Sequence, residues 1–135
     1  MKKVAWLFIV FLALAISTSA QKLVELKGTA TQWKDGKETP LQGATVVIGT
    51  NITLNTGGVA DEIRNARGIA AEVTTNDKGA FVAKVPAGRY AVILWKARYV
   101  PATYTATAPG TFTGSISPDA QPGAAGRHGS LAKKN

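Results

Sequence analysis

Residues 80–95 read AFVAKVPAGRYAVILW, the clearest strand pattern in the chain. Apolar residues occupy every second position from 81 to 85, which is the period of a strand with one buried face. A Pro-Ala-Gly-Arg turn follows at 86–89, and residues 90–95, YAVILW, are all apolar, so that positions 90, 92 and 94 can return on the same face. We therefore predict two adjacent antiparallel strands whose core residues share one face. That face comprises Phe81, Ala83, Val85, Tyr90, Val92 and Leu94.

Outward from this pair, the chain after Leu23 continues as short runs rich in Val, Ile, Thr, Tyr and Phe. Gly, Pro, Asn and Asp break these runs at intervals of about ten residues, a spacing typical of a sandwich or barrel. The sequence therefore predicts an all-β domain. The expected strands are residues 23–32, 44–50, 71–75, 80–85, 90–95, 102–107 and 111–117.

Three blocks within this region form a recognisable pattern. They read PLQGATVVI at 40–48, TTNDKGAF at 74–81 and VPAGRYAV at 85–92. Their order and spacing resemble the carboxypeptidase regulatory-like domain, a transthyretin-like (prealbumin-like) fold. The resemblance covers residues 23–107 and implies a seven-stranded Greek-key β-sandwich. It also implies an accessory role, because such domains are mostly appended to peptidases, outer-membrane receptors and secreted enzymes, and related sandwiches bind starch.

The chain departs from that pattern between the first two blocks, where residues 51–70 form a longer excursion. Val59, Ile63 and Ala66 lie at helical spacing, and Gly68 is a suitable stop. We expect either a helix of about two turns, too short to be stable unless it docks on the sandwich, or a loop.

The N-terminal residues 1–20 have the layout of a secretory signal peptide. Lys2 and Lys3 precede an apolar run of 13 residues, Val4–Ile16, and small residues lead to a predicted cleavage site near Ala20. The rival interpretation is a membrane anchor, but the run is shorter than the roughly 20 residues that span a bilayer. We expect a secreted or periplasmic protein without a membrane span after cleavage, and the lack of cysteine excludes a lipoprotein.

The chain therefore divides into a signal peptide at 1–20, a sandwich domain at 21–117 and a tail at 118–135. The tail is rich in Pro, Gly, Ala and Lys, so we predict a disordered basic segment. The formal net charge is +8, and it falls to +6 when Lys2 and Lys3 are removed. This charge, and the tail in particular, would serve either solubility or contact with an anionic surface. No motif specific to nucleic-acid binding is present.

Catalytic equipment is sparse in this sequence. There is no cysteine, and the single histidine, His128, lies in the predicted tail, so neither a nucleophile-base pair nor a set of metal ligands is apparent. The neighbouring acids Asp61 and Glu62 fit the start of a helix, and Asp35 fits a turn, better than they fit a glycosidase pair. The sequence predicts no enzyme, no catalytic residues, no metal and no cofactor.

Aromatic residues give the best indication of a binding surface. Because Tyr90, Val92 and Leu94 are assigned to the core, Trp95 must lie on the opposite face of its strand. The candidate surface for a ligand or partner comprises Trp33, Trp95, Tyr99 and Tyr104. Three alternatives remain open: residues 51–70 cover these side chains, they make a homo-oligomer contact, or they stack on sugars.

We therefore predict a secreted, non-enzymatic module with a structural or protein-interaction role in the cell envelope. The first alternative is a carbohydrate-binding module that uses the surface aromatics. The second is an accessory domain that acts in trans with an exported hydrolase. The partner, a protein or a glycan of the envelope, is not identified by the sequence.

Overall fold

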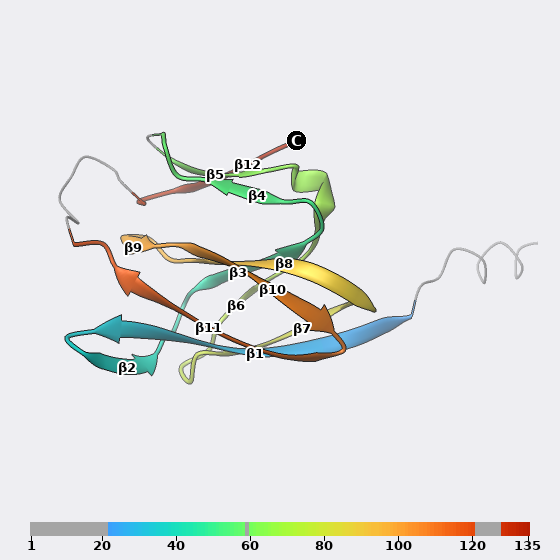
Figure 1. The fold of residues 1–135 in the computed structure, drawn as a ribbon, viewed down its shortest axis with the longest axis horizontal. Coiled ribbons are helices and arrows are strands. Elements are labelled where there is room, and N and C mark those ends of the chain that lie inside the picture. Colours follow the sequence, from blue (N-terminus) through green and yellow to red (C-terminus); the bar gives the residue numbers. More distant parts are fainter. Residues whose placement is uncertain (1–21, 59, 121–127) are drawn as a thin grey trace, which may run out of the picture.

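The computed structural model describes residues 22–58, 60–120 and 128–135, and they form three layers of β-strands (Figure 1). The predicted signal peptide and its cleavage site lie outside the described residues. Within the described ranges, no helix has the length and apolar character of a membrane span.

The first layer is a five-stranded sheet built around β1 (Leu23–Lys34). One edge of β1 pairs in parallel with β11 (Gly110–Pro118), which pairs in turn with the short β9 (Tyr99–Val100). The other edge pairs antiparallel with β7 (Ala80–Pro86) along its first half and with β2 (Lys37–Pro40) along its second half. A single strand thus organises the whole layer.

The second layer is an antiparallel sheet in the order β10-β8-β3-β6. Its strands are β10 (Ala102–Ala108), β8 (Gly88–Trp95), β3 (Thr45–Gly49) and β6 (Ile69–Thr74). The main hydrophobic core lies between the first and second layers and includes Leu26, Ile48, Phe81, Tyr90, Val92, Leu94, Phe112 and Ile116. An all-β sandwich, as predicted, is confirmed.

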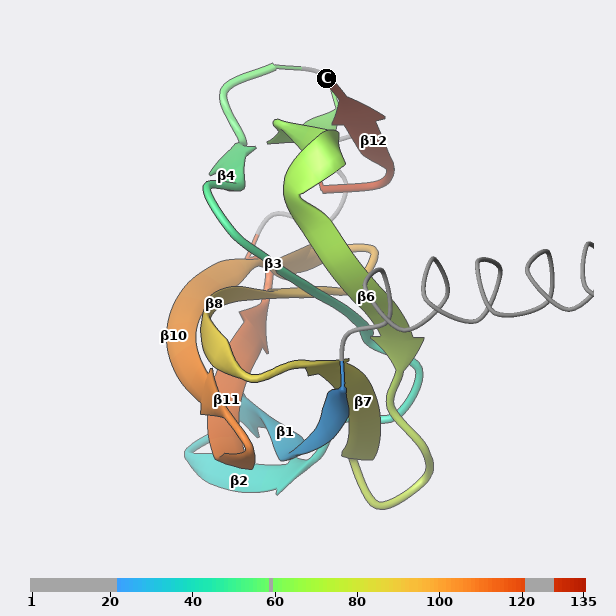
Figure 2. The same ribbon diagram turned by 90° about the vertical axis from the view of Figure 1, so that its right-hand side faces the viewer.

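The third layer is a small sheet in the order β12-β5-β4, on the far side of the second (Figure 2). It comprises β4 (Thr53–Asn55), β5 (Asp61–Arg64) and β12 (Leu131–Lys134). A second core lies beneath it, formed by Val47, Ile52, Ile63 and Ile93 with Leu131 packed against them. The third layer therefore covers the outward residues of β3 and β8 in the second sheet.

The predicted pairing of residues 80–95 is wrong, although its core face is right. Phe81 and Tyr90 both lie in the main core, but β7 pairs with β1 while β8 pairs with β10 and β3. The turn after Pro86 therefore carries the chain from one sheet to the other, and the Tyr90 hydroxyl donates a hydrogen bond to the Pro86 carbonyl across it. Alternation fixes which side chains face inward, and it does not specify the partner strand.

The local structure after residue 59 is neither of the two predicted alternatives, a helix or a loop. Residues 61–68 form β5 and a single 3-10 turn, Ala66–Gly68. Asp61 and Ile63 are both buried, so the segment follows the two-residue period of a strand lying on the second sheet.

The prediction that residues 118–135 form a disordered tail is wrong for residues 128–135. His128 is buried, and β12 pairs in parallel with β5 from Leu131 to Lys134. The docked strand gains backbone hydrogen bonds and a place for Leu131 against the second core, which its composition alone did not indicate. Residues 121–127 of the predicted tail lie outside the described residues.

Gly28 sits at the centre of the first layer, where a side chain would not fit. It pairs with Phe81 on one side and with Phe112 on the other. The two rings pack inward with centroids 6.1 Å apart, and a Cβ on Gly28 would lie 2.1 Å from the Phe81 ring. The missing side chain therefore lets the two aromatic rings come together over β1.

We predict that Gly28→Ala destabilises the fold by about 1–3 kcal/mol, because an inserted methyl group must displace a buried ring. Equilibrium unfolding in urea checks this. Gly58→Ala is the control, since its nearest neighbour would be a backbone oxygen 3.7 Å away. Equal stability of the two variants would contradict the packing argument.

Candidate functional site

Two of the four predicted surface aromatics point into the main core. Tyr99 donates a hydrogen bond of 2.7 Å to Oε1 of Gln32. Tyr104 bonds both the carbonyl and the N–H of Ser115, and its ring meets Phe112 edge-on at 5.4 Å. Both side chains are half-buried, and their hydroxyl groups are hydrogen-bonded within the chain.

Trp95 and Trp33 lie on different layers. The Trp95 indole lies under the third layer and donates a 2.6 Å hydrogen bond to Oδ2 of Asp61, so residues 51–70 cover it, as one alternative predicted. Trp33 is 48% exposed, on the outer face of the first sheet. The structure therefore does not bring the four aromatics together on one surface.

A buried polar cluster holds the C-terminal strand in place. Nδ1 of His128 lies 3.0 Å from both carboxylate oxygens of Asp61, and the two residues are only 4% and 2% exposed. Nε2 of His128 lies 3.8 Å from Oδ2 of Asp119. Backbone bonds join Asp61 to Ser130 and Arg98 to His128. No local sequence pattern could reveal this cluster, because Asp61 and His128 are 67 residues apart.

The contacts of this cluster join segments of the fold to one another, which indicates a structural role. The carboxylate of Asp61 is shared between an indole and an imidazole, and it points from the third layer toward Trp95 of the second sheet. Among the residues that the structure describes, no group of three or more His, Asp or Glu side chains could hold a metal ion.

Basic residues of the C-terminal strand pair with acids of the same chain. Lys133 contacts Glu72 at 2.5 Å, and Lys134 contacts Glu62 at 3.3 Å. The hydrogen bond and charge of Lys134, with a further contribution from Arg64, hold the pKa of Glu62 below its usual range. These two lysines therefore pair with acids of their own chain, whereas the sequence left open whether the tail's charge serves solubility or contact with an anionic surface.

The outer face of the five-stranded sheet carries the exposed apolar side chains. Among the described residues, four large hydrophobic side chains are exposed, and all four belong to this sheet: Leu23, Trp33, Val82 and Val100. Alternation along β1 turns residues 23 and 33 outward, because Leu26 and Ala30 are fully buried. Val82 pairs with Lys27 and Val100 with Ser117, which places them on the same face.

Hydroxyl groups fill the centre of this outer face. The pairs Thr29–Thr113 and Thr31–Ser115 lie side by side on β1 and β11, and Thr31 donates a 2.7 Å hydrogen bond to Glu38. By register, the charged residues that point outward are Glu25, Glu38, Lys27 and Lys84. Two acids thus balance two bases on one face of a chain whose formal charge is +8.

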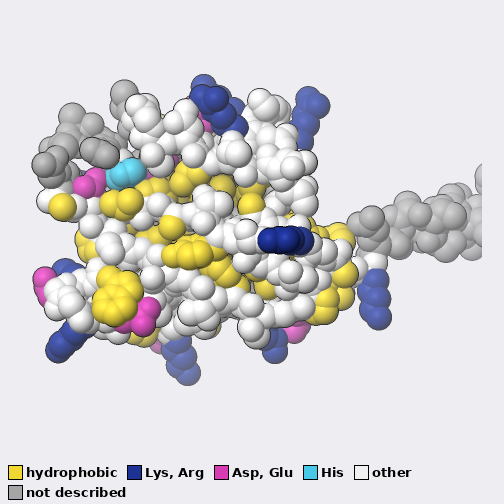
Figure 3. Space-filling model, viewed as in Figure 1, with side chains coloured by type: hydrophobic (Ala, Val, Ile, Leu, Met, Phe, Trp, Pro, Cys, Tyr) yellow, Lys and Arg dark blue, Asp and Glu magenta, His cyan; other side chains and the backbone are white. Residues whose placement is uncertain are grey.

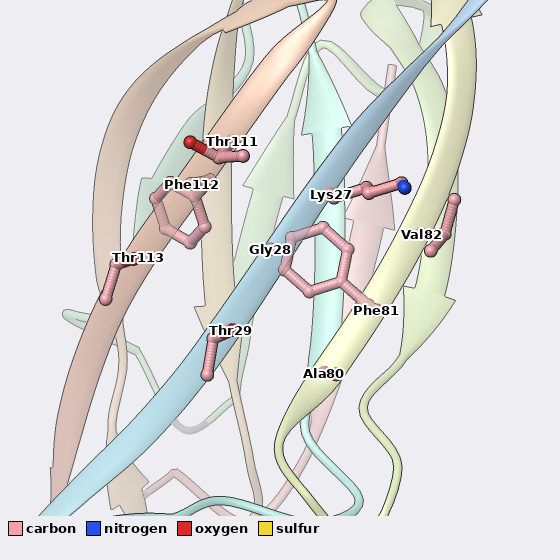
Figure 4. Close-up of a pocket in the computed structure, with 9 residues that line it drawn as sticks. All are labelled: Lys27, Gly28, Thr29, Ala80, Phe81, Val82, Thr111, Phe112 and Thr113. Atoms are coloured by element: carbon pink, nitrogen blue, oxygen red, sulfur yellow. The ribbon is translucent and has the colours of Figure 1, made fainter.

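A shallow depression of about 290 Å³ lies at the middle of this sheet (Figure 4). Its lining combines the outward residues of β1, β7 and β11 with the central row whose side chains pack inward. The lining residues are Lys27, Gly28, Thr29, Ala80, Phe81, Val82, Thr111, Phe112 and Thr113. We name the whole outward surface of β7, β1, β2, β11 and β9 the open face.

No described segment covers the open face, whereas the second sheet lies beneath the third layer (Figure 1). In the space-filling view most lysine and arginine side chains project from the edges of the molecule, and one lies in the middle of the visible face (Figure 3). Sequence reasoning found Trp33 but missed Leu23, Val82 and Val100. The available signal was the alternation along β1, because the odd-numbered, outward positions carry apolar residues at both ends of the strand.

No family model and no curated protein matches this chain. Among solved structures, it is similar to the shaft pilin SpaA (D295N mutant) of Lactobacillus rhamnosus GG, with 18% identity and a TM-score of 0.47 over 72% of this chain and 51% of that one. It is similar to the minor pilin GBS52 of Streptococcus agalactiae, with 15% identity and a TM-score of 0.43 over 73% and 45%.

A third similar structure is 5-hydroxyisourate hydrolase of Klebsiella pneumoniae, with 18% identity and a TM-score of 0.39 over 70% of this chain and 90% of that one. The chain spans about half the length of the two pilin chains that it matches. These likenesses, all below a TM-score of 0.5, assign no function to the chain.

We predict that His128→Ala releases β12 and lowers the free energy of unfolding by about 2–3 kcal/mol, because buried Asp61 loses its imidazole partner. Hydrogen exchange should show lost protection at residues 131–134, and urea unfolding gives the energy. Ser130→Ala is the matched control, since Ser130 is exposed and its carbonyl contact is retained. Full protection of β12 in His128→Ala would refute this anchoring role.

We also predict that Lys134→Met raises the pKa of Glu62, because the ammonium group that stabilises the carboxylate is gone. An NMR titration of the side-chain carboxyl measures this, with Lys78→Met as control. Since the folded-state pKa is depressed, the pair stabilises the fold above the pKa of the unfolded chain, and this contribution is lost as the pH falls through the folded-state value. An unchanged titration in Lys134→Met would argue against the docked position of β12.

Proposed function

We propose that the chain is an exported, non-enzymatic β-sandwich module with a structural or protein-interaction role in the cell envelope, and that it binds its partner through the open face. One observation carries this proposal. All four large hydrophobic side chains exposed on the described residues lie on that face.

The chemistry of the open face fits a protein contact. Protein interfaces are depleted in charge at their centre and enriched in aromatic residues. Here hydroxyls lie between β1 and β11, with Lys27 as the one charged side chain that lines the central depression, and Trp33 supplies a large apolar surface toward one end. On the other sheet, the outward apolar residues Val47 and Ile93 are already covered by the chain itself, which leaves the open face as the apolar surface for a partner.

Sequence features support the remaining parts of the proposal. The layout of residues 1–20 is that of a secretory signal, and the three blocks between 40 and 92 resemble the accessory carboxypeptidase regulatory-like domain. The sole histidine is engaged in the buried pair with Asp61, which supports a structural use of the imidazole.

A glycan site is not part of this proposal. Sugar stacking would use several exposed aromatic rings on one surface, and Tyr99, Tyr104 and Trp95 are each hydrogen-bonded within the chain. Trp33 is the one member of that predicted set on the open face.

The proposal is tested by a photo-crosslinking residue placed at Thr113 in the producing cells. We expect a protein adduct that disappears when Trp33→Ala is added, because that change removes the largest apolar contact of the open face. The matched position is Thr105 on β10, an exposed threonine of the other sheet. Adducts of equal yield at both positions, or none at Thr113, would reject the open face as the binding surface.

A further inference from the structure

We propose that the partner on the open face is a second copy of the same chain. In this arrangement the two open faces pack together about a two-fold axis that passes over Gly28, with the two β1 strands antiparallel. The inference rests on the proposed function and names the partner. It is carried by the order of side chains along β1 and by the charges of the face.

When two β1 strands are placed antiparallel, their outward side chains match each other in chemical character. Leu23 and Trp33 each lie five positions from Gly28, so antiparallel superposition about that residue places Leu23 of one copy against Trp33 of the other. Both side chains are about half exposed, at 54% and 48%. Two such apolar contacts therefore form by symmetry, one at each end of the strand.

The same register brings charged side chains opposite uncharged ones. Lys27 faces Thr29 of the other copy, and Glu25 faces Thr31. On the flanking strands Lys84 faces Pro40, because β7 and β2 lie on the same side of β1, and Glu38 faces Pro86. No like charges oppose each other across the contact, although two chains of formal charge +8 repel each other elsewhere.

The balanced charge of the open face favours a neutral partner surface over an anionic one. Two acids and two bases point outward on it, so it offers no attraction to an anionic polymer beyond the general charge of the molecule. A neutral surface of the same kind suits it better. A second copy supplies such a surface with a matching distribution of side chains.

The size of the face fits a reversible dimer. β1 has twelve residues, which extend about 40 Å at roughly 3.3 Å per residue. With one strand on each side at about 4.8 Å spacing, the footprint is on the order of 600 Å². This lies below the roughly 800 Å² that each partner buries in a standard stable interface. The depression at the Gly28 row lies on the proposed axis, where the Lys27 side chains of the two copies have room.

Opposite substitutions at Thr29 test the register. Thr29→Lys places a lysine against Lys27 of the other copy at two symmetric positions, and we expect dimer dissociation to increase about tenfold or more. Thr29→Glu places a carboxylate against the same lysine, so we expect association that is equal to or tighter than that of the unmodified chain. Sedimentation equilibrium of the purified protein over a wide concentration range measures both. Thr105→Lys, the same change on the other sheet, is the control and should leave association unchanged.

A second pair of variants tests the same dimer at positions other than Thr29. Leu23→Ala and Trp33→Ala should each weaken the dimer, and the double variant should weaken it less than the product of the two, since the residues contact each other across the axis. Circular dichroism confirms that each variant is folded before association is compared.

A monomer at all concentrations up to about 1 mM would overturn the second-copy proposal, and so would equal weakening by Thr29→Lys and Thr29→Glu. The crosslink at Thr113 separates this failure from failure of the proposed function. An adduct of twice the chain mass supports the second copy. A Trp33-dependent adduct with a different protein leaves the proposed function standing and rejects self-association, and the absence of any adduct rejects the proposed function itself.

Discussion

The pairing of β1 along both of its edges is the constraint on which the rest of the structure depends. This strand binds β11 on one side and β7 followed by β2 on the other, so most of its backbone polar groups are paired within the sheet. Its inward residues Leu26 and Ala30 are fully buried. The inward face brings Phe81 and Phe112 together over Gly28, and that contact fixes the register of three strands. The outward face receives no comparable cover, because the described chain beyond the sandwich is used on the other sheet.

The extra strands of this domain cover one side selectively. Residues 51–70 and the C-terminal strand together bury Val47 and Ile93, which alternation turns outward from the second sheet. The buried pair of Asp61 and His128 joins these two segments, which are far apart in the sequence. A short parallel pairing such as β5 with β12 gains little from backbone bonds alone, so the side-chain cluster supplies the specificity of docking.

Sequence reasoning predicted the properties that depend on local period and failed where partners are distant. Alternation at Phe81–Val85, continued by the two-residue period of a strand through the apolar run Tyr90–Leu94, correctly predicted the core residues, and the density of turns predicted the all-β class. The same alternation could not reveal that the turn at 86–89 changes sheets, because strand partners are set by tertiary packing. Spacing of Val59, Ile63 and Ala66 suggested a helix, yet the apolar surface of the second sheet stabilises an extended segment there. The C-terminal tail was misjudged because composition carries no information on a single buried histidine.

The candidate site was predictable only in part for the same reason. Trp33 could be named from the sequence, but which of the other aromatics were exposed depended on hydrogen bonds to Gln32, Ser115 and Asp61, each contributed by another strand. The side chains that accompany Trp33 on the open face are aliphatic and come from three strands, so they formed no motif. Their common feature appears only once β1 is placed between β7 and β11, because register then turns Leu23, Val82 and Val100 to the same side. This basic protein keeps one face neutral in net charge and covers much of the opposite sheet with its own chain. Its two faces therefore differ, and only one of them is open to symmetric pairing.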